Sequence, residues 1–246
     1  MRFGEGEFFF YIFKRSKHTI MKLFISFILL ASWGFSQVTD IDGNTYKIVK
    51  IGTQTWFAED LKVTRFNNGD EIPDYTANWT YNTGKILDDS YLIKNLPAMC
   101  YYNNNKNNPL YSPYVTISNR NVCPNGYKVP STRDYLILID YLGGLEKAGI
   151  ALKSADGWEH AGNNSSGFNL KGRGMRYGSG EFDNKYNSTY LLTKSIEKKI
   201  NSNNDFIYYH PVIFATFSED YYEKKPTKID SQFAAVVAGT IRCIKD

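Results

Sequence analysis

The sequence contains few of the residues from which metal centres and nucleophilic active sites are built. Its 246 residues include three cysteines and three histidines. No two cysteines have the C-x-x-C spacing of a redox pair or a zinc knuckle, and the H-E-x-x-H pattern of zinc peptidases is absent. His160 and His210 lie in no recognisable nucleophile motif, so we interpret them as loop or core residues. The sequence therefore predicts no metal site, no cofactor and no catalytic residue.

A dense stripe of lysine and arginine, which is typical of nucleic-acid-binding proteins, is also missing. The chain has 29 basic and 25 acidic residues, but five of the basic and two of the acidic ones lie within 1–36. The overall net charge of +4 therefore falls to +1 for the remainder. We expect no nucleic-acid partner.

Residues 1–36 differ from the rest and have the layout of a secretory signal peptide. A lysine precedes an apolar run at 23–31, and small residues stand shortly before position 37. The run is shorter than the roughly 20 residues that a membrane-spanning helix needs, so we expect no membrane span in the mature chain. We interpret 1–20 as the product of a start codon assigned too early, with Met21 as the true start; the alternative is an extended basic leader. The expected mature domain, 37–246, is secreted or lies at the cell surface.

Short strands separated by turns dominate the mature sequence. Alternating side chains over 46–51 and the aromatic segment 55–57 predict a hairpin. Further strands are expected at 98–102, 206–217 and 233–244.

Residues 131–142 carry the clearest helix signal. Ser131 is a favourable N-cap, and Asp134 follows three residues later as in a capping box. Four apolar residues at helical spacing form one face: Tyr135, Leu138, Ile139 and Leu142. Gly143 and Gly144 then end the helix, because glycine adopts the left-handed conformation of a C-cap without penalty. A second short helix is expected to follow, up to residue 153.

A long region rich in Gly, Asn and Ser extends over 156–186, and aromatic residues are spaced through it. Within it, the segment 172–180 lacks the strand-then-helix context of a nucleotide-binding loop, so we interpret it as a hairpin-rich surface loop. No internal repeat or linker divides the mature chain, which predicts a single domain of mixed helix and strand.

Several segments in order resemble one known family. They are DIDGNTYKIVKIGTQTWFAEDLK, CPNGYKVPSTRDYLILIDYLGG, AGIALKS, GW, NNSSGF and the terminal IRCIKD. Over about residues 38–246 the chain resembles the Fibrobacter succinogenes major paralogous domain, a family of secreted or surface proteins whose biochemical function is largely undefined. A more distant similarity to C-type lectin-like domains and formylglycine-generating enzymes implies an α+β fold with short antiparallel sheets and paired terminal strands. It also implies that a long loop-rich region carries any ligand site.

The resemblance also implies a disulfide. Cys123 before the helix and Cys243 in the last strand stand where the lectin-like pattern would be bridged. The alternatives are a bond from Cys100 to either of them, or three buried free thiols. Formylglycine-type oxidase chemistry needs reactive thiols in a ligand cleft, and these positions fit structural roles better.

Aromatic and basic residues are the candidate ligand contacts, most of them within about 156–230. The candidates are Trp79, Trp158, Arg173, Arg176 and Tyr177. Tryptophan rings, including that of Trp56, would stack on sugars, while Tyr177 and Arg173 or Arg176 supply polar contacts. The resemblance places Trp56 and Trp158 in the core instead, whereas Trp79 lies in a polar stretch and is expected to be exposed.

Calcium-dependent sugar binding is not expected, because the acidic-Pro-Asn loop and Trp-Asn-Asp strand of calcium lectins are absent. Glu71-Ile72-Pro73-Asp74 is not that loop and lies too early in the chain. Alternating Asp40, Asp42 and Asn44 form either a weak ion site or a turn. We expect an exported, non-catalytic lectin-like domain that binds a polysaccharide or envelope component. The alternatives are a structural or adhesive surface protein with protein partners only and, third, an enzyme of unrecognised type.

Overall fold

The computed structural model describes residues 37–77, 97–177, 180–195, 197–200, 206–209, 212–216, 228–230 and 237–246. The chain divides into two units, Met1–Ser36 and Gln37–Asp246, and every described residue belongs to the second. Within those residues, no helix has the length and apolar character needed to cross a membrane.

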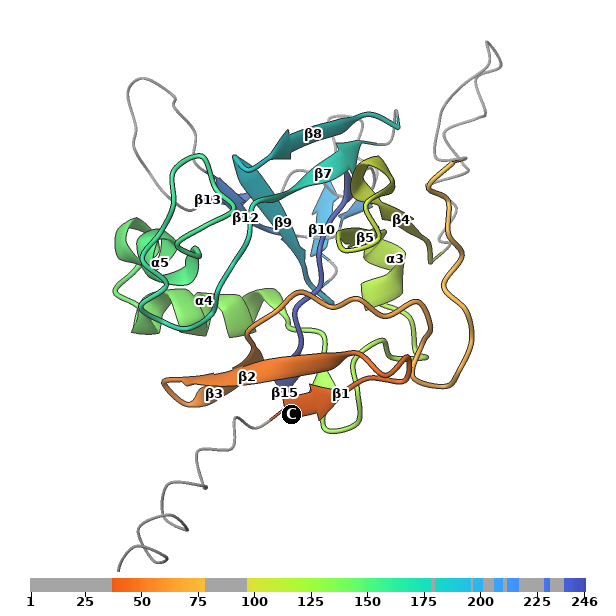
Figure 1. Ribbon diagram of the computed structural model, residues 1–246, viewed down its shortest axis with the longest axis horizontal. Helices are drawn as coiled ribbons and strands as arrows, with labels where there is room; N and C mark the ends of the chain where they lie inside the picture. The colour runs from red at the N-terminus through yellow and green to blue at the C-terminus, as the bar shows by residue number, and fades with distance from the viewer. Residues whose placement is uncertain are drawn as a thin grey trace, which may run out of the picture. The chain divides into compact units, whose positions relative to one another are not determined.

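The first sheet joins segments from the two ends of the second unit (Figure 1). In order, its antiparallel strands are β1 (Gln37–Thr39), β2 (Thr45–Ile51), β3 (Gln54–Phe57), β15 (Ile244–Lys245) and β6 (Tyr127–Lys128). The β2–β3 hairpin confirms the predicted one, with Val49 opposite Trp56. Ile244 of the last strand also pairs with Trp56, so the last strand joins the sheet that opens the domain, although β1 and β15 are not neighbours in it.

A second sheet contains the strands that follow the helices. Their order is β13 (Lys228–Asp230), β12 (Val212–Thr216), β9 (Ser188–Leu192), β7 (Arg173–Tyr177) and β14 (Val237–Ala238), and β8 (Phe182–Lys185) also pairs with β7. The interpretation of 172–180 as a hairpin-rich surface loop is therefore wrong for 173–177, which form a strand within the sheet, and residues 178–179 lie outside the described ones. Because β7 pairs with β8, β9 and β14, its central residues Gly174, Met175 and Arg176 are buried.

Two hairpins and short helices complete the described elements. The hairpins are β4 (Met99–Tyr101) with β5 (Pro109–Tyr111), and β10 (Glu197–Ile200) with β11 (Phe206–Tyr209). The helices are η1 (Tyr102–Asn104), α3 (Pro113–Thr116), α4 (Thr132–Tyr141) and α5 (Leu145–Leu152). The architecture is α+β, as predicted.

Helix α4 has the ends that its sequence predicts. The Ser131 hydroxyl accepts a hydrogen bond from the Asp134 amide at 3.3 Å, and the Asp134 carboxylate accepts one from the Ser131 amide at 2.7 Å. At the other end, Gly143 and Gly144 have φ of +92° and +86° and donate their N–H groups to Asp140 and Ile139. This is a Schellman ending, which satisfies carbonyls left open by the last turn.

Two main apolar clusters fill the interior. In one, α4 and α5 pack on the first sheet around Trp56, whose ring lies 5.0 Å from that of Tyr135 and 5.6 Å from that of Phe168, centroid to centroid. The other cluster contains residues of both sheets and the segments between them, including Tyr46, Met175 and Cys243. The predicted inward face of α4 is confirmed by the burial of Tyr135, Leu138 and Ile139 and the partial burial of Leu142.

The end of the chain connects the two sheets rather than forming one long strand. Residues 237–238 pair with β7 in the second sheet, Gly239 bridges Tyr111 of β5, and residues 244–245 pair in the first sheet (Figure 1). The predicted strand over 233–244 is therefore wrong for 241–243. Those three residues cross between the sheets, and their complete burial accounts for the apolar sequence that suggested a strand.

Candidate functional site

A pocket of about 600 Å³ lies on the side of the domain formed by the turn before β2, the segment 64–76 and strand β4. Its lining residues are Asp42, Thr64, Arg65, Glu71, Ile72, Pro73, Asp74, Met99 and Tyr101. None of them is among the candidate ligand contacts from the sequence. The tetrapeptide 71–74, which we set aside as too early in the chain for a lectin loop, supplies four of the nine.

The wall of the pocket is held by backbone hydrogen bonds to its neighbours. The Ile72 amide donates to the carbonyl of Thr64 at 2.8 Å. Further along, the Met99 amide donates to the carbonyl of Pro73, and the Tyr75 amide donates to the carbonyl of Met99, both at 2.9 Å. Since both ends of 72–75 are bonded to other segments, the side chains of this wall have defined positions.

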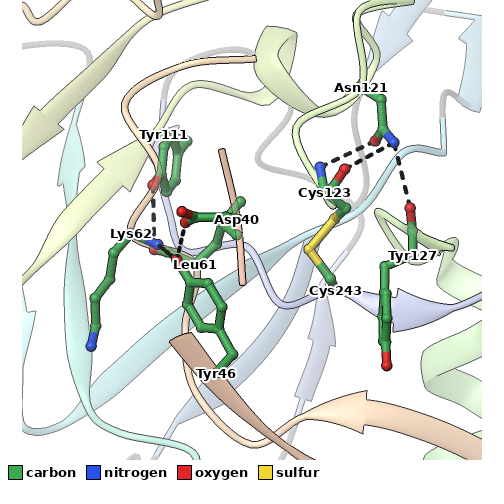
Figure 2. Close-up of a disulfide and its surroundings, with 9 residues drawn as sticks. All are labelled: Asp40, Tyr46, Leu61, Lys62, Tyr111, Asn121, Cys123, Tyr127 and Cys243. Atoms are coloured by element: carbon green, nitrogen blue, oxygen red, sulfur yellow. Dashed lines mark hydrogen bonds between the residues drawn. A yellow bond between two sulfur atoms is a disulfide. The ribbon is translucent and has the colours of Figure 1, made fainter. Parts of the chain in front are cut away.

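A turn built on Asp40 presents Asp42 to the pocket. One Asp40 oxygen accepts from the amides of Asp42 and Asn44, both at 2.9 Å, and the other accepts from the Tyr46 hydroxyl at 2.6 Å (Figure 2). The Lys62 amide donates to that same hydroxyl at 2.9 Å. Of the two interpretations of this sequence, the turn is therefore confirmed. Within the described part of the chain, no three His, Cys, Asp or Glu side chains are grouped so that they could hold a metal ion.

Asp42 is fully engaged inside the pocket. One carboxylate oxygen accepts from the Arg65 guanidinium at 2.6 Å, and the other accepts from the amide and hydroxyl of Thr64 at 2.5 and 2.9 Å. Burial alone would raise the pKa of Asp42, but these hydrogen bonds and the Arg65 charge hold it below its usual value. Asp42 is therefore an ionised acceptor whose orientation is fixed.

Asp74 has a more open position at the rim. One of its oxygens accepts from the Thr76 amide at 2.8 Å and hydroxyl at 2.5 Å, and the other lies 3.4 Å from the Lys106 ammonium. Partial burial opposes ionisation, but the Thr76 hydrogen bonds and Lys106 lower the pKa of Asp74. Lys106 also stands 3.8 Å from the centre of the Tyr101 ring. The rim of the pocket therefore combines the ionised carboxylate of Asp74, the ammonium group of Lys106 and the aromatic ring of Tyr101.

Arg176 lies behind the pocket and does not line it. This β7 residue is 3% exposed, and its guanidinium donates to the carbonyls of Thr76 at 3.1 Å, Tyr75 at 3.4 Å and Gly180 at 3.0 Å. Because Tyr75 and Thr76 directly follow Asp74, Arg176 anchors the backbone of the pocket wall. Its predicted role as a ligand contact does not fit this burial.

Cys100 is buried next to Arg176. Among the described cysteines, it is the one that forms no disulfide. Burial raises the pKa of Cys100 to about 12, although the adjacent guanidinium acts in the opposite direction. We expect a thiol reagent at about pH 8 to modify native Cys100 roughly a thousandfold more slowly than free cysteine, because the thiolate is the reactive form. The measurement is the rate of reagent uptake under native conditions.

The same assay in denaturant without reductant should count one thiol per chain, and the Cys100→Ser variant should show none. Rapid native labelling, or three thiols in denaturant, would contradict the environment described for this side chain.

Arg173, another sequence candidate, is part of a buried ion-pair network. Its Nε donates to Asp60 at 2.7 Å, and Arg242 donates to the other Asp60 oxygen at 2.6 Å. Burial would raise the pKa of Asp60, but the charges of Arg242 and Arg173 lower it. Arg242, completely buried, also donates to the Phe168 carbonyl and stacks 4.3 Å from the Phe168 ring centre. The network links three segments that are distant in sequence, around Asp60, 168–173 and Arg242, and these contacts explain the position of Arg173 without a ligand.

The aromatic candidates are not brought together. Trp158 is 8% exposed, its indole N–H donates to the Leu170 carbonyl at 2.6 Å, and Lys153 lies 4.9 Å from its ring centre. The prediction of core positions is confirmed for Trp158 and Trp56, and stacking of Trp158 on a sugar does not fit this burial. Tyr177, at the end of β7, packs partly buried against the cluster between the sheets. Trp79 lies outside the described residues.

A disulfide joins Cys123 to Cys243 inside the cluster between the sheets, which confirms the predicted pair (Figure 2). Asn121 supports it: its amide group donates to the Cys123 carbonyl at 3.1 Å, and its side-chain oxygen accepts from the Cys123 amide at 3.2 Å. The two Cα atoms are 6.0 Å apart and 120 positions apart in sequence. The bond therefore connects the approach to α4 with the segment that crosses between the sheets.

Comparison with known proteins identifies the family of the chain. The model of the Fibrobacter succinogenes major domain matches residues 49–245. The chain belongs to this family. No curated protein sequence and no solved structure matches it.

In this Fibrobacter succinogenes major domain, the pocket combines Asp42, which precedes the matched residues, with lining residues inside them. Sequence reasoning missed the pocket because its members come from four separate stretches of the chain. Asp74 and Thr76 do have a local signal, since an aspartate often accepts hydrogen bonds from the residue two positions on. That signal predicts a turn, and only the fold shows that the turn borders a cavity.

Proposed function

We propose that this chain is an exported, non-catalytic domain that binds a glycan of the cell envelope through the pocket around Asp42 and Asp74. The observation that carries the proposal is the pocket, whose volume of about 600 Å³ falls within the roughly 300–1,000 Å³ typical of small-molecule sites. The proposed site is therefore formed by residues that precede α4, and not by the segment 156–230 that was expected to bind the ligand.

The chemistry of the lining suits a ligand rich in hydroxyl groups. A sugar hydroxyl both donates and accepts, and the pocket offers carboxylate acceptors beside the cationic donors Arg65 and Lys106. Among the residues that the structure describes, the contact of this Asp74 oxygen is the long one of 3.4 Å to Lys106, so the oxygen has capacity to accept from a ligand. Pro73 and the Tyr101 ring add apolar surface against which a sugar ring can pack.

The electrostatics favour binding over hydrolysis. A glycosidase needs a general acid, usually a carboxyl group whose pKa is raised so that it holds a proton. In this pocket, the pKa values of Asp42 and Asp74 are both lowered, so both carboxylates are ionised at neutral pH. Ionised, hydrogen-bonded carboxylates serve as acceptors rather than as proton donors.

Export and a lectin-like arrangement form part of the same proposal. The leader-like sequence of 1–36 and the disulfide support export, because disulfides persist in oxidising compartments. The insertion of the last strand into the sheet that opens the domain, and the capped helix packed on that sheet, support the lectin-like arrangement.

Binding of the full chain to arrayed envelope polysaccharides, followed by titration calorimetry, tests the proposal. We expect the Asp74→Ala variant to bind about tenfold to a hundredfold more weakly, since hydrogen bonds to a charged group contribute roughly 1.5–3 kcal/mol. The matched control is Asp156→Ala, which removes an exposed carboxylate paired with Lys171 in the loop-rich segment. Loss of binding in Asp156→Ala but not in Asp74→Ala would contradict the pocket as the binding site and would indicate a site within 156–230.

A second candidate, a structural or adhesive protein with protein partners, is favoured by one feature. Apolar side chains of α4 and α5 are 42–64% exposed: Leu136, Ile137, Tyr141, Leu145 and Ile150. Grouped exposed apolar residues often mark protein contacts. Absence of binding to every arrayed glycan, together with a particle mass that rises with protein concentration in light scattering, would favour this candidate.

A further inference from the structure

The charged groups of the pocket do not balance. Three carboxylates line it, those of Asp42, Glu71 and Asp74, whereas two cations, Arg65 and Lys106, stand in or beside it. Asp42 is paired with Arg65 and Asp74 with Lys106. Among the charged groups that the structure describes there, one negative charge, that of Glu71, is left over.

Glu71 is placed where its charge faces the same space as these pairs. Its backbone lies opposite Arg65 in an antiparallel bridge, so the two side chains emerge on one face. The Arg65 guanidinium is directed elsewhere, with Nε on Asp42 at 2.6 Å and Nη2 on the Ile41 carbonyl at 3.0 Å. No hydrogen bond or ion pair joins the exposed Glu71 side chain to another residue that the structure describes.

We propose that the pocket prefers a glycan that carries a protonated amine, that is, an unacetylated amino sugar, and that Glu71 is the residue that determines this preference. The inference rests on the proposed glycan function of the same pocket. The hydroxyl groups of such a sugar bind to Asp74 and Lys106, and its ammonium group pairs with Glu71.

An organic cation fits the arrangement better than a metal ion. Two of the three carboxylates already accept from protein donors, and in the described residues no three acidic, imidazole or thiol groups converge as metal ligands. An ammonium group requires one carboxylate and neighbouring acceptors, whereas a hard cation such as Ca²⁺ takes six or more oxygen ligands. The cavity also has room for the sugar ring that carries the amine.

The experiment compares two hexamers of β-1,4-linked sugar, one of glucosamine and one fully N-acetylated, by calorimetric titration of the full chain. The titrations are run at about pH 6, where most of the amines of the glucosamine hexamer are protonated. We expect the glucosamine hexamer to bind about fivefold more tightly, a size typical of a solvent-exposed ion pair, and the preference to shrink as salt is added.

Variants assign the preference to one side chain. Glu71→Gln should bind the two hexamers equally, because it removes the charge that distinguishes the amine from the acetamide. The matched control Glu146→Gln removes an exposed carboxylate from α5 and should keep the full preference. A uniform loss of the preference in both variants would indicate a general effect of net charge and overturn the role of Glu71.

The possible failures can be told apart. If the acetylated hexamer binds as tightly as the glucosamine hexamer, and Asp74→Ala weakens both, the preference for an amine is wrong and the pocket remains the glycan site. If neither hexamer nor any arrayed polysaccharide binds, the proposed function fails and the amine preference fails with it.

Discussion

Replacement of Asp60 by alanine is expected to lower the free energy of unfolding by about 3–5 kcal/mol, the cost of breaking a buried ion pair from one side. Asp60 is 3% exposed and accepts from both Arg242 and Arg173. Without it, the completely buried Arg242 keeps its charge and loses its carboxylate partner. Urea denaturation of wild type and variant at neutral pH measures the difference.

The adjacent residue provides a matched control. Glu59 pairs with Lys62 at 3.6 Å, and both side chains are about one-third exposed. Since exposed ion pairs contribute roughly 0–1 kcal/mol, Glu59→Ala should shift the unfolding midpoint little. Equal losses of unfolding free energy for Glu59→Ala and Asp60→Ala would contradict a large contribution of the buried ion-pair network to stability.

Acid should remove the contribution of Asp60. Its pKa is lower in the folded chain than in the unfolded chain, so its charge stabilises the fold above the unfolded value of about 3.9. As the pH falls below that value toward the folded pKa, this stabilisation is lost. The difference in unfolding free energy between wild type and the uncharged Asp60→Asn variant should therefore be largest near neutral pH and become smaller in acid.

Loss of the disulfide is the second large effect. The double variant Cys123→Ser/Cys243→Ser should lose about 4–5 kcal/mol of unfolding free energy, because the bond closes a loop of 120 positions and restricts the unfolded chain. Both sulfur atoms lie in fully buried residues, so serine hydroxyls placed there add a desolvation cost in the same direction. The measurement is equilibrium denaturation without reductant.

Cys100→Ser is the control for replacing a buried cysteine without breaking a bond. It should cost less than the double variant, because it leaves the cross-link in place. If the two proteins unfold at the same denaturant concentration, the cross-link contributes little to stability. Reduced wild-type protein should lose less stability than the double variant, because it lacks the cross-link but carries no buried serine hydroxyls.

Local sequence determined the elements whose signals span a few residues. The capping box and glycine ending of α4 satisfy hydrogen bonds within the helix itself, and alternation with a tight turn specifies the β2–β3 hairpin. The pairing of Cys123 with Cys243 followed from family resemblance rather than from spacing. Each of these features was predicted and is confirmed.

Arg173, Arg176 and Trp158 show the limit of such reasoning. As a sequence, the Gly-rich stretch around the arginines resembles a surface loop. In the fold, β7 lies among three other strands, so Arg173 reaches Asp60 and Arg176 reaches the backbone at 75–76. Burial of an arginine requires partners far along the chain, and the sequence alone does not show where they will be.

The sequence alone thus determined the family, the α+β class, the capped helix and the cysteine pair. The tertiary structure decided where a ligand can bind, because Asp42, Arg65, the segment 71–74 and Tyr101 become neighbours only after the first sheet, the wall segment and β4 have assembled. Helix caps and tight turns depend on interactions within a few residues, whereas a pocket depends on contacts between segments that are distant in sequence. In the sequence, nothing distinguishes Glu71 from the other acidic residues. Only the fold shows that the neighbouring described carboxylates are paired with cations and that Glu71 is not.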